Sequence, residues 1–173
     1  MTSEVSHSMR MKTLLVLRHA KSSWSDSALD DHERPLNTRG RRDAPRMGEL
    51  VREYGLLPDV VLSSDAVRAR LTAEAVTEAS GYAGEILLDP RLYLARPADI
   101  LSVLPTVGES AGTVMIVGHN PGLEQLLEQL TGERHDMPTA ALAQISLPID
   151  QWRQLTRSTR GTLVGLWRPK ELT

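Results

Sequence analysis

The sequence predicts a three-layer α/β fold, with a mostly parallel central sheet flanked by helices. Short apolar runs, such as residues 14–17 and 114–117, read as buried strands, and they alternate with longer stretches of helical periodicity. That alternation is typical of βαβ units. At 173 residues, the chain is long enough for one domain with a real core and too short for two. We therefore expect one domain over residues 11–173, preceded by a polar, disordered tail at 1–10.

The individual elements follow from apolar periodicity and from residues that start or stop helices. In chain order we expect a strand at 12–18, a helix at 39–54, a strand at 59–62, a helix at 65–79, a short strand at 85–88, a helix at 97–107, a strand at 113–117, a helix at 123–130, and strands at 143–147 and 161–167 that would suit a closing antiparallel pair. Ser64 is expected to cap the helix at 65–79, and Asn120, followed by Pro121, the helix at 123–130.

Composition excludes several function classes. A formal net charge of -2 gives no general attraction to nucleic acid or to an anionic membrane. The absence of cysteine excludes disulfides, thiolate metal sites and a cysteine nucleophile. No apolar stretch approaches the roughly 18 residues of a membrane span, and residues 1–10 lack the apolar core of a secretory signal. We therefore expect a cytoplasmic location and neither a nucleic-acid nor a membrane partner.

Two histidines and two arginines stand where strands end. Arg18 and His19 close the first apolar run, His119 closes the run at 114–117, and Arg68 lies in the first turns of the helix after the second strand. Ligands of open α/β sheets bind beyond the carboxyl ends of the strands. Helix N-termini there, after Ser64 and Asn120, would add backbone N–H donors. The pattern predicts an anion site that contains a nucleophile.

The motifs resemble those of the histidine phosphatase superfamily. They are LRHA at 17–20, SSDAVRA at 63–69 and GHN at 118–120. RHAKSSW at 18–24, followed by RPLNTRG at 34–40, is similar to the SixA-like phosphohistidine phosphatase branch. The resemblance covers the chain from residue 12 nearly to the C-terminus. It implies the fold of the phosphoglycerate mutases.

The resemblance also implies roles for the four residues. His19 would attack phosphorus and form a phosphohistidine intermediate that water hydrolyses, so it must be neutral at rest. Arg18 and Arg68 would hold phosphoryl oxygens with forked donors, and His119 would bind a further oxygen in the transition state. This chemistry needs no metal and no cofactor. The implied partner is a histidine-phosphotransfer protein or another phosphohistidine protein.

The chain departs from the superfamily pattern at the proton donor. Many members place a glutamate after the third strand, whereas residues 92–95 contain no carboxylate. Phosphohistidine needs a strong acid less than an alkyl ester does, because imidazole is a better leaving group than an alkoxide. Among the acidic residues of the loop at 20–37, Asp31 is our first candidate for a substitute donor. A solvated or salt-bridged carboxylate is the alternative.

Residues around the motifs have weaker indications. Lys21 and Ser22 follow the nucleophile closely enough to contact substrate, although a loop lysine is often merely solvated. Arginines at 39, 41, 42 and 46 form either a solvated helix face or a surface for an acidic partner.

Four other functions remain as alternatives. A hydrolase of small phosphomonoesters would use the same four residues. A non-catalytic phosphate-binding module would be expected to lack one of them. A mutase would need a general acid and a closed pocket, and a metal site would place no arginines beside its histidines.

Overall fold

A six-stranded sheet with strand order β3-β2-β4-β1-β5-β6 forms the centre of the computed structural model, which describes residues 11–172. The strands are β1 (Lys12–Arg18), β2 (Val60–Ser63), β3 (Ile86–Leu88), β4 (Thr113–Gly118), β5 (Leu142–Leu147) and β6 (Thr162–Trp167). The pairs β1–β4, β2–β4 and β2–β3 are parallel, whereas β5 is antiparallel to both β1 and β6. The predicted α/β class with a mostly parallel sheet is confirmed, and β5 and β6 are the expected antiparallel pair. The tail predicted at 1–10 lies outside the described residues.

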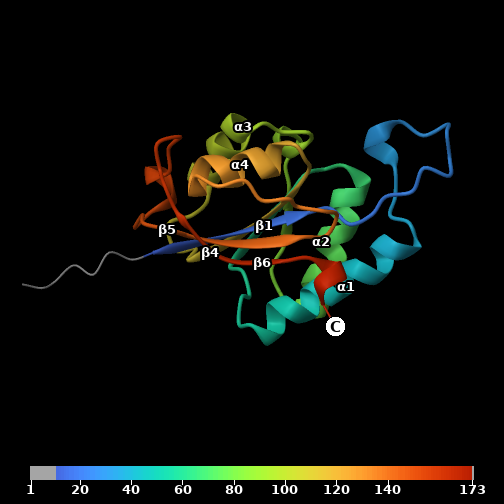
Figure 1. Cartoon of the computed structure of the whole chain (residues 1–173), viewed down its shortest axis with the longest axis horizontal. Coiled ribbons are helices and arrows are strands. Elements are labelled where there is room, and N and C mark those ends of the chain that lie inside the picture. Colours follow the sequence, from blue (N-terminus) through green and yellow to red (C-terminus); the bar gives the residue numbers. More distant parts are fainter. Residues whose placement is uncertain (1–10, 173) are drawn as a thin grey trace, which may run out of the picture.

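Helices lie against both faces of this sheet. They are α1 (Thr38–Glu53), α2 (Val67–Ser80), α3 (Pro97–Val103) and α4 (Gly122–Thr131), with short 3₁₀ helices at Asp31–Glu33, Pro90–Leu92, Leu104–Thr106, Trp152–Gln154 and Pro169–Glu171. Figure 1 shows α3 and α4 above the sheet and α1 below it. Helix α2 shares a buried core cluster with α1. None of the described helices is both long and apolar enough to cross a membrane.

The side chains of β1 explain why its apolar run is continuous. Leu14 and Val16 belong to the core on the α3 and α4 side, and Leu15 and Leu17 to the core on the α1 and α2 side. All four are fully buried. A strand covered on both faces has no solvent side, so it carries no polar alternation.

The register of the central strands brings the predicted site residues to one edge. Arg18 is the partner of Gly118 across β1 and β4, and Ser63 is the partner of Val117 across β2 and β4. The residues that directly follow β1, β4 and β2 are therefore His19, His119 and Ser64, and they lie close to one another at this edge. The long segment at 19–37 extends beyond the same end of the sheet (Figure 1).

All four helices differ from their predicted bounds, α1 by only one residue at each end, and the differences in the other three have an identifiable cause. Helix α2 begins at Val67, and Ser64 is not its cap, because its Oγ accepts from the Ala66 N–H and contacts a histidine instead. Helix α4 begins at Gly122, and Asn120 does not cap it, because its amide donates to Glu124 and to the Met137 carbonyl. The helix expected over 97–107 is α-helical only to Val103 and continues as a 3₁₀ turn that contains a proline, which lacks the N–H an α-helix would use.

Candidate active site

His19 is held rigidly at the carboxyl end of β1. Its backbone N–H donates to the Gly118 carbonyl at 3.0 Å, and its carbonyl accepts from Ala140 at 3.0 Å. The following N–H, that of Ala20, donates to Thr72 Oγ1 at 2.9 Å. His19 Nδ1 lies 2.7 Å from the Ala20 carbonyl oxygen. Because a carbonyl only accepts, Nδ1 carries the hydrogen and Nε2 keeps its lone pair.

His119 faces His19 from the end of β4. The two ring centroids are 5.1 Å apart. His119 Nε2 lies 2.8 Å from Ser64 Oγ. Nδ1 of His119 is buried without a protein hydrogen-bond partner among the described residues. One ring nitrogen of His119 therefore contacts the Ser64 hydroxyl, and the other has no protein partner among these residues.

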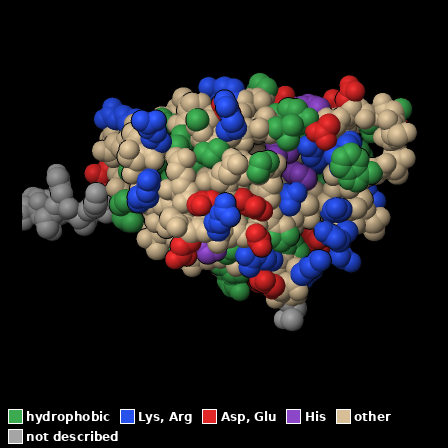
Figure 2. Space-filling model, turned by 45° about the horizontal axis from the view of Figure 1, so that its top comes forward, with side chains coloured by type: hydrophobic (Ala, Val, Ile, Leu, Met, Phe, Trp, Pro, Cys, Tyr) green, Lys and Arg blue, Asp and Glu red, His purple; other side chains and the backbone are tan. Residues whose placement is uncertain are grey.

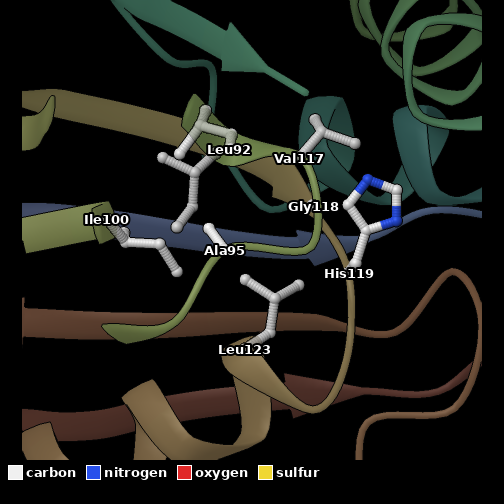
Figure 3. A pocket seen from close by; sticks show the side chains of 8 residues that line it. Leu92, Ala95, Ile100, Val117, Gly118, His119 and Leu123 are labelled. Carbon is white, nitrogen blue, oxygen red and sulfur yellow. The ribbon is translucent and has the colours of Figure 1, made fainter. Parts of the chain in front are cut away.

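An apolar wall lies behind His119. Figure 3 shows the imidazole at the edge of a small pocket lined by Leu92, Ala95, Ile100, Val117 and Leu123. This pocket has a volume of only about 10 Å³. The Tyr93 ring packs nearly perpendicular to the imidazole, with a centroid distance of 5.4 Å. His119 is therefore excluded from water on its inner side.

Both imidazoles are neutral at physiological pH. Burial is the largest cause and lowers the pKa of His19 to about 4, and Arg68, Arg18 and Arg34 lower it further. Burial also lowers the pKa of His119 to about 3, with additional contributions from His19 and Arg68. The charged form of each ring is disfavoured because it would lose hydration and lie beside cations. The neutral state is the one that leaves Nε2 of His19 nucleophilic.

The two arginines lie beside this pair. Arg18 donates through one terminal nitrogen to the Met137 carbonyl at 3.1 Å, and its buried Nε has no protein partner among the described residues. Arg68 is 4% exposed, and its two terminal nitrogens donate to the backbone oxygen and to Oδ2 of Asp31, at 2.7 and 2.9 Å. Both arginines line the same cavity as the two histidines.

Asp31 connects three side chains at this site. Its carboxylate accepts from Arg68, from Arg34 at 2.9 Å and from the Tyr93 hydroxyl at 2.5 Å. The Tyr93 hydrogen bond is the largest cause that lowers the Asp31 pKa to about 2, and the arginines contribute as well. Asp31 is therefore ionised at neutral pH and would have to gain a proton before it could donate one.

A cavity of about 280 Å³ contains all seven predicted site residues. Its lining includes Arg18, His19, Lys21, Ser22, Asp31, Arg68 and His119. Ser22 is buried, and its hydroxyl accepts a hydrogen bond from Arg34. Figure 2 shows histidine side chains reaching a hollow of the surface, with lysine and arginine side chains beside them.

Four contributors to the site were missed in the sequence. Arg34 lies in the motif at 34–40, but the sequence did not indicate a role for its positive charge. Its guanidinium stacks over the Trp24 ring at 3.1 Å from the centroid. Ser64 was interpreted as a helix cap. Tyr93 and Thr72 had no local signal at all. Among the described residues, no group of three or more His, Asp or Glu side chains is arranged to hold a metal ion.

Comparison with known proteins identifies the same family as the motifs do. The family description of the histidine phosphatase superfamily (branch 1) matches residues 14–93. An uncharacterized chloroplastic protein of Arabidopsis thaliana is 32% identical over 154 residues, which are 83% of this chain and 70% of the relative. The structure of the "putative phosphohistidine phosphatase SixA" of Agrobacterium tumefaciens has a TM-score of 0.78 and 30% identity, and the match covers 91% of this chain and 98% of that one.

A further solved structure supports the fold alone. The protein histidine phosphatase SixA complexed with tungstate matches with a TM-score of 0.79 and 24% identity, over 93% of this chain and 99% of that chain. The motifs, the relatives and the similarity of fold all indicate the same family. The chain is therefore a SixA-like member of the histidine phosphatase superfamily.

Proposed function

We propose that this protein hydrolyses phosphohistidine on other proteins through a covalent intermediate on His19. The observation that carries the proposal is the placement of a neutral imidazole, with its Nδ1–H held by the Ala20 carbonyl, between two arginines and a second histidine. The relative in Agrobacterium tumefaciens bears the name of a phosphohistidine phosphatase, which supports the same substrate class.

The first step transfers the phosphoryl group. The Nε2 lone pair of His19 attacks phosphorus, and the bond between phosphorus and the substrate imidazole breaks, with the bonding pair going to the departing nitrogen. A substrate ring protonated at its other nitrogen leaves as neutral imidazole, so no acid is needed. Arg18, Arg68 and His119 stabilise the negative charge on the phosphoryl oxygens.

The second step releases inorganic phosphate. Once Nε2 is phosphorylated, the ring still carries its Nδ1–H, so it is cationic and its hydrogen bond to the Ala20 carbonyl grows stronger. Water then attacks phosphorus, the P–N bond breaks, and the electron pair returns to Nε2. The proton lost by water passes to the phosphate product or to solvent. No metal takes part in either step.

The ionised state of Asp31 favours this substrate over alkyl phosphates. An alkoxide leaving group requires a proton in the transition state, and a carboxylate with a pKa of about 2 holds none at neutral pH. The low pKa of Asp31 therefore argues against the predicted role of this residue as a proton donor, which stays a prediction.

The rim of the cavity supports a protein substrate. Trp24 is 72% exposed and Leu94 is 54% exposed, and both line the cavity. Exposed apolar side chains beside a site are typical of surfaces that contact other proteins.

The test compares a histidine-phosphorylated phosphotransfer protein with p-nitrophenyl phosphate and sugar phosphates. We expect fast turnover of phosphohistidine, slow turnover of the esters, and loss of both in His19→Ala. His135→Ala serves as the control, because His135 lines a different pocket. Acid-labile, alkali-stable phosphate bound to wild type but not to His19→Ala would identify the intermediate. Efficient ester hydrolysis without action on phosphohistidine would refute the proposal and favour a small-molecule phosphatase.

A further inference from the structure

A second concave surface adjoins the active site, and we name it the basic groove. It has a volume of about 100 Å³. Four cationic side chains, one carboxylate, two prolines and a threonine line it: Arg39, Arg42, Arg46, Lys170, Asp43, Pro138, Pro169 and Thr139. The groove is therefore strongly positive, although the whole chain has a formal net charge of -2.

The arginines of the groove share one face of α1. Positions 39, 42 and 46 are three and four residues apart, so their side chains project to the same side of the helix. Asp43, whose side chain is 6% exposed, approaches Arg39, Arg42 and Arg46 at nitrogen–oxygen distances of 3.8, 3.6 and 3.9 Å. One carboxylate at these long distances cannot neutralise three guanidinium groups, so most of the positive charge faces outward.

The basic groove lies next to the catalytic cavity. Thr139 lines both. Arg39 donates to the Thr139 hydroxyl at 3.2 Å, which fixes the helix against the loop between the two hollows. Pro138 and Pro169 restrict the backbone of the groove walls. A chain whose modified side chain enters the cavity can therefore place its neighbouring residues in the groove.

We propose that the basic groove binds an acidic segment of the phosphoprotein substrate, next to the phosphohistidine. This inference rests on the proposed function and adds the sequence context that the enzyme prefers. Outward-facing cations beside a reaction site raise the local concentration of an acidic partner and its association rate. A small phosphate ester does not extend beyond the cavity, so it gains nothing from the groove.

The experiment uses two synthetic peptides that carry phosphohistidine in the same sequence, flanked in one by glutamates and in the other by glutamines. For wild type at low salt, we expect kcat/KM to be about tenfold higher for the glutamate peptide, within the range of electrostatic steering. The advantage should shrink as salt is added. In Arg42→Glu/Lys170→Glu it should disappear or reverse, while turnover of p-nitrophenyl phosphate stays at the wild-type value.

Two further variants make the test specific. Arg42→Gln/Lys170→Gln removes the same two positive charges but adds no negative charge beside Asp43. Loss of the preference in this variant too would show that the effect does not come from local unfolding caused by repulsion. Arg157→Glu/Arg160→Glu makes an equal change of charge before β6, at the opposite end of the strands from the groove, and should keep the preference. A preference for glutamate that survives the groove substitutions, or its absence in wild type, overturns the docking inference alone. No turnover of either peptide, with esters still hydrolysed, overturns the proposed function as well.

Discussion

Replacing Thr72 by valine tests whether one buried hydroxyl positions the nucleophile. Thr72 is fully buried in α2, and its Oγ1 accepts from the Ala20 N–H at 2.9 Å while it donates to the Arg68 carbonyl at 2.7 Å. Valine has nearly the same shape but cannot accept a hydrogen bond. The N–H next to His19 then lies in a fully buried segment without its partner.

An unsatisfied buried donor costs about 1–3 kcal/mol of the free energy of unfolding. For a chain of this length, a loss of about 2 kcal/mol lowers Tm by about 4–8 °C. The catalytic effect should be larger, because a small displacement of a reacting group costs up to about 100-fold in rate. We expect kcat for p-nitrophenyl phosphate to fall about tenfold or more in Thr72→Val.

The assays are urea unfolding and steady-state kinetics, with Thr77→Val as the matched control. Thr77 lies in the same helix, and its hydroxyl donates to the Glu74 carbonyl at 3.1 Å. Its replacement should change stability by less than about 1 kcal/mol and leave kcat unchanged. Equal effects of the two substitutions, or wild-type kinetics in Thr72→Val, would refute the reasoning.

Three other predictions follow from the site. The pKa of His19 is about 4 and that of His119 about 3, whereas both titrate near 6.5 in the unfolded chain, so folding stability is complete above about pH 6.5 and falls as the pH drops towards 4. Urea unfolding should show a loss of about 2 kcal/mol per histidine between about pH 7 and pH 5, and the loss should be smaller in His119→Asn. Asp31→Asn should tighten inhibition by inorganic phosphate, because a carboxylate that competes for an arginine is removed; a slower turnover confined to alkyl phosphates would instead identify Asp31 as a proton donor. In Gly40→Ala, the added Cβ would lie 2.2 Å from the Lys21 carbonyl oxygen, so we expect a loss of about 1–3 kcal/mol, measured by the same unfolding assay, and no loss would contradict the close approach.

The electrostatics of the site could be inferred only in outline from the sequence. Neutrality of His19 was expected from the chemistry, but its physical cause is burial together with the approach of Arg18, Arg34 and Arg68 from three separate segments. The apolar wall behind His119 is likewise assembled from residues of distant segments. Such effects depend on distances between elements, and the sequence contains no record of those distances.

Helix boundaries show how side-chain hydrogen bonds can override a local pattern. Ser64 and Asn120 have the residue types and positions of helix caps, yet neither caps its helix. The Ser64 hydroxyl instead hydrogen-bonds with His119, and the Asn120 amide donates to Glu124 and to the Met137 carbonyl. A cap contributes about 1 kcal/mol, so a competing partner supplied by the tertiary structure is enough to displace it.

The sequence by itself determined the class of fold and the four residues at the strand ends. Buried strands are continuous apolar runs, and the carboxyl ends of parallel strands meet at one edge, so the convergence of Arg18, His19 and His119 follows from local pattern and topology. The tertiary structure decided the rest. Asp31 meets Arg68 and Tyr93 across 37 and 62 residues of sequence, and these contacts depend on the path of an irregular loop. Such a path has no periodicity, so only the folded chain defines which side chains it brings together.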